Sequence, residues 1–136
     1  MSIVKFSTKS HYGLRLLTAL ASAEKGQAVS LAQISKKEKI SRAYLEELAV
    51  KLKTAKILAS KKGAGGGYYL RNAPSSVRLG KVIEILEGPV VDFDCIAGNI
   101  KCGVENACLS KKFWIKIKKD IERSLNSLTL EDLVGK

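Results

Sequence analysis

The stretch SRAYLEELAVKLKT (residues 41–54), followed by ILASKKGAGGGYYL (residues 57–70), decides the fold of this 136-residue chain. Leucines recur at helical spacing through the first part, and Ser41 is a typical residue to cap a helix N-terminus. In the second part, side chains of alternating character flank a glycine-rich tip on both sides, which is the pattern of a β-hairpin. We therefore expect a helix over residues 42–55 with a hairpin directly after it.

A second short helix is predicted just before this one. Ser30 and Gln33 stand three residues apart, as the two partners of a capping box do, which favours a helix over residues 30–37. Ile40 and Leu45 fit a hydrophobic staple at the start of the next helix. Two short helices joined by a tight turn indicate a helix-turn-helix, although any small helical bundle can show this pattern. A hairpin in the following position would be its wing.

Helical patterns also flank this unit. We expect helices over residues 8–24, 79–87 and 110–127. The last of these carries an apolar stripe of five residues at helical spacing: Trp114, Ile117, Ile121, Leu125 and Leu128. Because no long element follows, the stripe must pack on the chain's own core or on a second subunit, and we favour a dimer.

These patterns together predict a mainly α fold. It consists of a winged helix-turn-helix domain over residues 1–88, a cysteine-bearing loop over residues 89–109, and a dimerisation helix with a C-terminal segment over residues 110–136.

Charge is distributed unevenly along the chain. The formal net charge is +11, and residues 1–87 hold 16 Lys and Arg against 6 Asp and Glu, whereas residues 88–136 hold 8 against 7. A positive field favours nucleic acid first and an acidic membrane second, while a merely solvated basic surface is the alternative. No apolar run reaches the roughly 18 residues that span a bilayer, and no signal peptide is recognised, so we expect a cytoplasmic protein without membrane partners.

The first turns of the helix over residues 42–55 supply candidate DNA contacts, since the start of a recognition helix reaches base edges. Arg42 can pair with guanine, Tyr44 can contact a phosphate or a thymine methyl group, and Glu46 can accept from a cytosine amino group. The alternative for Glu46 is an ordinary helix-surface charge. The complete expected set on this helix is Ser41, Arg42, Ala43, Tyr44 and Glu46.

Lys61 and Lys62 are placed at the tip of the predicted wing. There they would neutralise backbone phosphates or enter the minor groove, unless they are simply solvated. The glycine-rich tip is a weak candidate for a nucleotide phosphate loop, because it lacks the Gly-Lys-Ser/Thr ending and does not lead from a strand into a helix.

The three cysteines follow the pattern Cys95-x6-Cys102-x5-Cys108. An odd number in a chain of this kind argues against a structural disulfide framework. Thiolates bind soft and borderline metals, and the absence of paired C-x-x-C spacing disfavours a zinc ribbon. The pattern is compatible with an iron–sulfur cluster, and the alternative is three ordinary thiols.

The residues SRAYLEEL (41–48), KGAGGGYYL (62–70) and the three cysteines resemble the Rrf-type (IscR/NsrR/CymR) family of bacterial regulators, cluster-binding branch. The resemblance covers residues 3–134, with one extra residue between the first two cysteines. It implies a homodimer that binds pseudo-palindromic double-stranded DNA. It also implies a 2Fe–2S cluster, or in the alternative a 4Fe–4S cluster, that senses cluster status, redox state or nitric oxide.

The resemblance leaves the fourth cluster ligand open. In one branch a histidine stands three residues after the last cysteine, where this chain has Lys111, a poor ligand because its amine is protonated near neutral pH. In the nitric-oxide-sensing branch an acidic residue near the start of the first helix reaches over from the partner subunit, and His11 occupies the matching position. We expect His11 to be that ligand, with four alternatives: Asp92, Asp94, Glu105 or a small exogenous molecule.

An enzymatic function is not expected, because the single histidine lies outside any visible catalytic constellation. The expected function is a DNA-binding transcriptional regulator controlled by an iron–sulfur cluster. The rival hypotheses are a regulator of the same fold that uses cysteine oxidation or another metal, and a DNA-binding assembly protein without a sensor.

Overall fold

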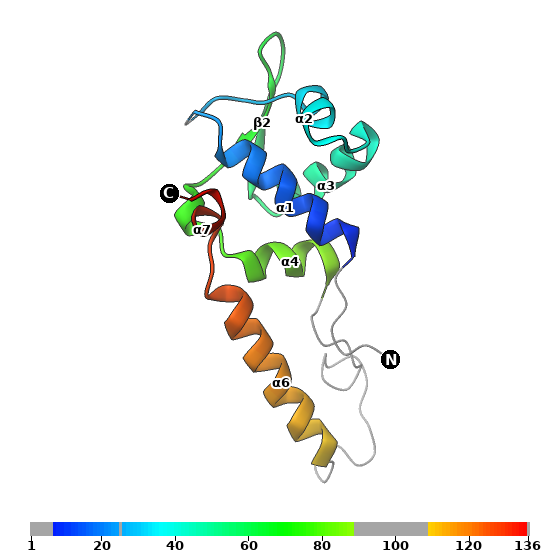
Figure 1. Ribbon diagram of the computed structural model, residues 1–136, viewed down its shortest axis with the longest axis vertical. Coiled ribbons are helices and arrows are strands. Elements are labelled where there is room, and N and C mark those ends of the chain that lie inside the picture. The colour runs from blue at the N-terminus through cyan, green and yellow to red at the C-terminus, as the bar shows by residue number, and fades with distance from the viewer. Residues whose placement is uncertain (1–6, 25, 89–108, 136) are drawn as a thin grey trace.

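The computed structural model describes residues 7–24, 26–88 and 109–135. Helices account for most of this part of the chain, and a single hairpin supplies its two strands (Figure 1). In chain order the elements are α1 (Thr8–Ala21), α2 (Leu31–Glu38), α3 (Arg42–Thr54), β1 (Leu58–Lys61), β2 (Gly67–Leu70), the 3-10 helix η1 (Pro74–Ser76), α4 (Leu79–Glu87), α6 (Leu109–Asn126) and α7 (Leu130–Val134).

Serine side chains begin the first three helices. The Ser30 hydroxyl accepts from the backbone N–H of Gln33 at 3.1 Å, and the Gln33 side chain accepts from the Ser30 N–H at 3.2 Å, which confirms the predicted capping box. Ser41 caps α3 by accepting from the Tyr44 N–H. The predicted end of α1 at residue 24 is wrong, because the helix ends at Ala21. The hydroxyl and the backbone N–H of Ser22 both donate hydrogen bonds to the Thr18 carbonyl.

The hairpin after α3 is the expected wing. β1 and β2 pair in antiparallel register from Leu58 opposite Leu70 to Lys61 opposite Gly67. Val29, just before α2, adds one further rung by exchanging two 2.9 Å hydrogen bonds with Tyr68. Gly67 has a φ of +147°, and a Cβ on it would lie 2.2 Å from the Val29 carbonyl oxygen, so this close approach requires glycine.

One apolar core joins α1, α3, β1 and α4. Its largest fully buried side chains are Leu16, Leu17, Leu45, Leu48, Leu52, Leu58, Leu130 and Val82. Gly13 lets α1 lie directly on α4, because a Cβ there would fall 2.3 Å from Leu86 Cδ1. α7 returns to this core: the Leu130 side chain is buried in it, and the Leu130 N–H donates to the Val77 carbonyl at 2.9 Å. We refer to α1–α4, the wing and α7 together as the body.

α6 leaves the body as a long projecting helix (Figure 1). None of its 18 residues is buried, although Trp114, Ile117, Ile121 and Leu125 are half-buried along one side. We refer to these four residues as the apolar stripe. Leu128, which we expected to extend it, lies beyond the end of α6 and is 47% exposed. Across residues 7–24, 26–88 and 109–135, no helix is both long and apolar enough to cross a membrane.

Candidate nucleic-acid interface and metal ligands

The start of α3 presents the residues expected to read DNA. Ser41, Arg42, Ala43 and Glu46 are exposed, and Tyr44 is half-buried. Lys39, the residue directly after α2, has a left-handed conformation with a φ of 59°, and it begins the tight turn that leads into α3. The exposed backbone and side chains of the first turn of α3 are free to approach base edges, as a recognition helix requires.

Tyr44 links this first turn to α1. Its hydroxyl shares a 3.0 Å hydrogen bond with the Thr8 hydroxyl, and its ring packs edge-on against the Tyr12 ring with the centroids 5.8 Å apart. Such aromatic pairs contribute about 0.5–1.5 kcal/mol beyond the area they bury. The phenol that was expected to contact DNA therefore also fixes the orientation of α3 against the body.

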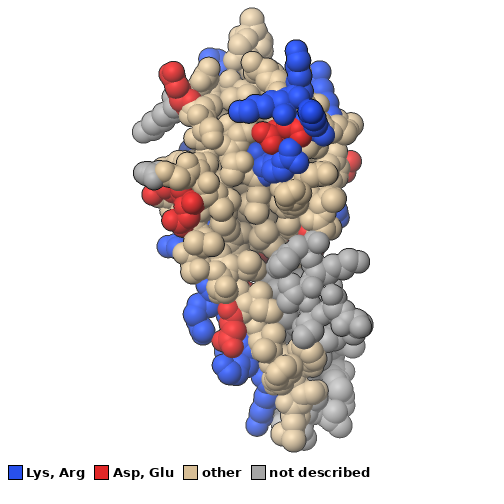
Figure 2. All heavy atoms as spheres, viewed as in Figure 1, with Lys and Arg blue, Asp and Glu red and all other residues tan. Residues whose placement is uncertain are grey.

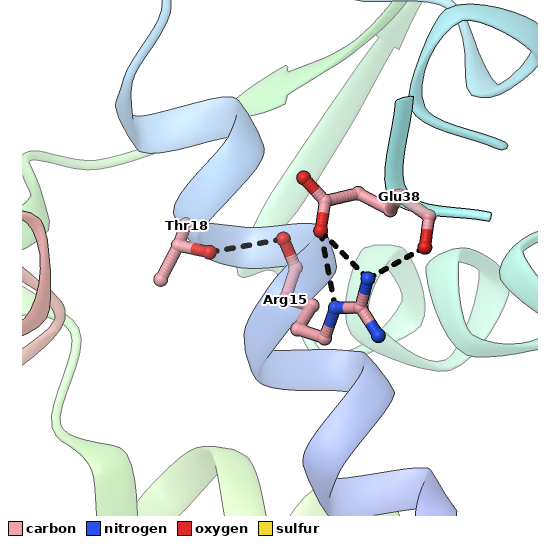
Figure 3. Close-up of polar contacts among 3 residues, drawn as sticks. All are labelled: Arg15, Thr18 and Glu38. Atoms are coloured by element: carbon pink, nitrogen blue, oxygen red, sulfur yellow. Dashed lines mark hydrogen bonds and ion pairs between the residues drawn. The ribbon is translucent and has the colours of Figure 1, made fainter. Parts of the chain in front are cut away.

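A second polar contact from α1 holds the end of α2. Arg15 donates from Nε to the Glu38 carboxylate at 3.0 Å and from its terminal nitrogen to the Glu38 carbonyl at 2.5 Å (Figure 3). The guanidinium also lies 5.5 Å from the centroid of the Tyr12 ring. Thr8, Tyr12 and Arg15 follow one another at helical spacing, so one side of α1 supports both helices of the helix-turn-helix.

The wing lysines flank the tip of the hairpin. Lys61 is the last residue of β1, and Lys62 follows it; both are exposed. In Figure 2 the extreme tip itself carries no charge, while Lys and Arg gather over the end of the molecule that holds α2 and α3. Lys53 of α3 donates to the Ser60 hydroxyl of β1 at 2.8 Å, which ties the wing to the recognition helix.

Glu87, the last residue of α4, makes a contact that the sequence analysis missed. Its carboxylate accepts from the backbone N–H groups of Ser7 at 2.7 Å and Ser10 at 3.3 Å, and from both serine hydroxyls. Burial alone would raise the pKa of Glu87, but these hydrogen bonds together outweigh it, and the pKa lies below its ordinary value. The available signal was indirect: α1 begins at a serine cap with no acidic residue in its first turn.

The three predicted thiolate ligands, Cys95, Cys102 and Cys108, lie outside the described residues. Three thiols with one imidazole form a donor set of the kind that iron–sulfur centres use, so their chemistry suits the expected cluster. His11 is exposed on α1, with its ring centroid 5.3 Å from that of Tyr12. Within the described ranges no three His, Cys, Asp or Glu side chains gather closely enough to hold a metal ion.

Known proteins resemble this chain over nearly its whole length. CymR of Bacillus subtilis is 33% identical over 132 residues, which cover 97% of this chain and 91% of that protein. IscR of Cereibacter sphaeroides is 34% identical over 136 residues, which cover 96% and 87%. Both are named as HTH-type transcriptional regulators, and neither is named as an enzyme.

Solved structures share the fold. That of CymR, titled the global cysteine regulator of B. subtilis, superposes with a TM-score of 0.78 at 33% identity and covers 96% of both chains. IscR of T. potens gives a TM-score of 0.75 at 36% identity and covers 96% of this chain and 86% of that one. The family model described as "Rrf2: Iron-dependent Transcriptional regulator" matches residues 6–136. The predicted mainly α winged helix-turn-helix is thereby confirmed, and the chain belongs to the Rrf2 family of transcriptional regulators.

Proposed function

We propose that this Rrf2-family regulator binds a pseudo-palindromic double-stranded operator as a homodimer and that an iron–sulfur cluster controls its affinity for that DNA. The observation that carries the DNA-binding part is the exposed first turn of α3, which is supported from behind by α1 and tied to a basic wing. A rigid, exposed and positively charged surface of this kind is what a major groove and its phosphates select.

In this arrangement α3 enters the major groove and the wing lies along the backbone. Arg42 pairs with a guanine, Glu46 accepts from a cytosine amino group, and Lys61 and Lys62 neutralise phosphates. Ser41 and Ala43 occupy the same exposed turn and approach the neighbouring bases or phosphates. Tyr44 contacts a phosphate or a thymine methyl group, while its hydroxyl is shared with Thr8.

A second copy of the chain would cover α6. A helix of 18 residues in which no residue is buried gains less from tertiary packing than a core helix, and packing is what usually stabilises helices in proteins. Pairing two apolar stripes removes them from water and places two recognition helices on one duplex. Half-sites about one helical turn apart then follow from the two-fold symmetry of the dimer.

Cys95, Cys102 and Cys108 would hold the cluster, with 2Fe–2S favoured over 4Fe–4S, and His11 would supply the fourth ligand. Relatives named IscR and the iron-dependent description of the family support an iron-containing cofactor, whereas the choice of ligands rests on the residue types alone. When bound, the cluster supplies a redox-responsive centre. His11 would ligate through one nitrogen of its imidazole ring.

A second candidate function is favoured by the similarity to CymR, whose structure is titled as that of a global cysteine regulator. In that case the same fold binds DNA, and the three thiols respond by oxidation or by binding another metal. Anaerobic purification separates the two. A reddish-brown protein with stoichiometric iron and sulfide supports the cluster, whereas a colourless protein with reactive thiols supports the second candidate.

DNA binding is tested by selection from a pool of random duplexes. The protein should enrich a sequence with two inverted half-sites. Arg42→Ala should weaken binding to the selected duplex by about 1–3 kcal/mol while leaving random DNA less affected. An equal loss on both would show that Arg42 contacts only phosphate, and failure to enrich any sequence would contradict operator binding.

His11 is tested with His11→Ala protein purified without oxygen. A lost or shifted visible spectrum supports ligation, whereas an unchanged spectrum rules it out and directs attention to Asp92, Asp94 and Glu105. A mixed dimer then asks which subunit supplies the imidazole. If one chain lacks His11 and the other lacks the cysteines, a ligand that crosses between subunits leaves one complete site, and a ligand from the same subunit leaves none.

A further inference from the structure

The carboxylate of Glu87 completes the cap of α1 from a distance of 80 residues along the chain. In a capping box, the third residue of a helix reaches back to the N–H of the cap residue with its own carboxylate or amide. Here that third residue is Ser10, whose side chain is too short for this role. Glu87 accepts from the Ser7 N–H instead and places a negative charge at the positive end of the α1 dipole.

α1 extends this contact to the recognition helix. Thr8, the first residue of α1, bonds to the Tyr44 hydroxyl, and Tyr12, one turn further, packs on the Tyr44 ring. Figure 1 shows the start of α1 and the end of α4 at one corner of the body. The close packing of Gly13 on Leu86 leaves α1 little room to move independently of α4.

We propose that Glu87 is a positioning residue for DNA reading: its contact with Ser7 and Ser10 fixes the start of α1, and α1 in turn fixes Tyr44 and the first turn of α3. Glu87 touches no DNA in this arrangement and acts through α1. Removing the charge of Glu87 would loosen the orientation of Arg42 and Glu46. The affinity for a specific sequence should therefore fall more than the affinity for random DNA, which depends on phosphate contacts.

The same contact gives a regulatory route, and this part rests on the proposed function. In the sequence, Gly88 follows Glu87 directly, and the first cysteine comes seven residues later. A cluster-dependent displacement of Glu87 or Gly88, at the end of α4, would act on the start of α1 and, through it, on Tyr44. Two sites are coupled in this way when both bias the position of one packed element.

The positioning role is tested with cluster-free, full-length protein by fluorescence anisotropy on the selected duplex and on a random duplex. Glu87→Gln and Tyr44→Phe should each weaken binding to the selected duplex by roughly threefold to tenfold, the usual effect of losing a hydrogen bond. The double variant should lose less than the product of the two single effects, because Glu87 and the Tyr44 hydroxyl both act through the start of α1. Affinity for the random duplex should stay within about twofold of wild type.

Glu84→Gln is the matched control. Glu84 is an exposed carboxylate one turn earlier on α4, and its side chain accepts no hydrogen bond from the residues described in the structure. The Glu84→Gln variant should bind the selected duplex and the random duplex with wild-type affinity. Multiplicative losses in the double variant, or equal losses on both duplexes, would overturn the positioning role. If circular dichroism shows that Glu87→Gln does not fold, Ser10→Ala is used instead, because it removes one of the hydrogen bonds to Glu87. A double-mutant cycle of Ser10→Ala with Tyr44→Phe then tests the positioning role.

The regulatory route is tested by the ratio of selected-duplex affinities with and without the cluster. In Glu87→Gln this ratio should move towards one, while Glu84→Gln keeps the wild-type value. A wild-type ratio that persists in Glu87→Gln would overturn the route. If the wild-type ratio is itself one, cluster sensing fails together with the route, and the double-mutant cycle in cluster-free protein still decides whether Glu87 positions α3.

Discussion

The body and α6 differ in how far they bury their apolar side chains. In the body, α1, α3, β1, α4 and α7 enclose a core of leucines, most of which have no more than 2% of their surface exposed, and polar contacts from α1 also hold α2 and α3. In α6 no residue is buried, and the apolar stripe remains half-exposed. The body therefore encloses its own core, whereas α6 leaves an apolar stripe half-exposed that the proposed dimer would cover. This difference predicts that DNA recognition and dimerisation can be damaged separately.

The largest expected effect comes from breaking the proposed α6 interface. Ile121→Asp puts a charge in the apolar stripe, so the protein should become monomeric by sedimentation while its circular dichroism spectrum stays helical. Loss of the second half-site contact should lower operator affinity by at least about 100-fold, the usual scale of bivalent binding. Lys119→Asp, on the exposed opposite side of the same helix, is the control. A monomer that binds the operator as tightly as wild type would contradict the role of α6.

A core substitution should act on the body alone. Leu45 is completely buried in α3, and Leu45→Ala should lower the free energy of unfolding by about 2–5 kcal/mol in urea titrations. Leu125→Ala, in the apolar stripe, should have an effect that depends on protein concentration, because the proposed dimer would cover the part of Leu125 that the single chain leaves exposed. Identical, concentration-independent losses for the two variants would remove the distinction between the regions.

Salt dependence should distinguish the lysines of the two regions. If Lys61 and Lys62 each neutralise a phosphate, replacing both with alanine should flatten the plot of log affinity against log salt by roughly one to two units. Replacing Lys118 and Lys119 of α6 in the same way removes equal charge from the projecting helix and should leave the slope unchanged. An unaltered slope in the wing variant would remove the wing from the DNA interface.

The smallest expected effect is a pH dependence of stability. The hydrogen bonds to Glu87 hold its pKa below the ordinary value of 4.5, so their stabilisation is present above that value and is lost as the pH falls through the lowered pKa. Glu87→Gln should remove this acid sensitivity from the free energy of unfolding. An equally acid-sensitive variant would show that other groups are responsible.

Asp120 of α6 offers the contrasting case for the same measurement. Its hydrogen bond from Lys116 lowers its pKa, and Arg123 adds to the effect, but these groups are exposed. Salt should therefore suppress any contribution of Asp120 to the pH dependence. The contribution of Glu87, which is half-buried and bonded to backbone N–H groups, should persist in salt.

Local patterns were sufficient to predict most elements of the body. Ser30 with Gln33 and Ser41 specified two helix starts, because a cap and its partner lie within one turn of sequence. The glycine at position 67 was recognisable as part of a turn, but its contact with Val29 depends on a strand neighbour that no local pattern indicates.

Contacts between distant residues could not be predicted in this way. Glu87 and Ser7 are 80 residues apart, and the sequence shows each only as an ordinary polar residue at a helix end. Tyr44 was correctly placed in the first turn of α3, yet its hydrogen bond to Thr8 arises from the packing of α1 on α3. The metal-ligand assignment for Cys95, Cys102, Cys108 and His11 stays a prediction.

Control of DNA binding by the cysteines is tested most directly by the operator affinity of anaerobically purified wild-type protein compared with that of Cys95→Ala, Cys102→Ala and Cys108→Ala. Each variant should lose the visible absorption of the cluster, remain a folded dimer, and bind the selected duplex with an affinity that differs severalfold from that of the wild type. Wild-type affinity in all three variants at every operator sequence selected would contradict control of DNA binding by the cysteines, even if metal binds to them.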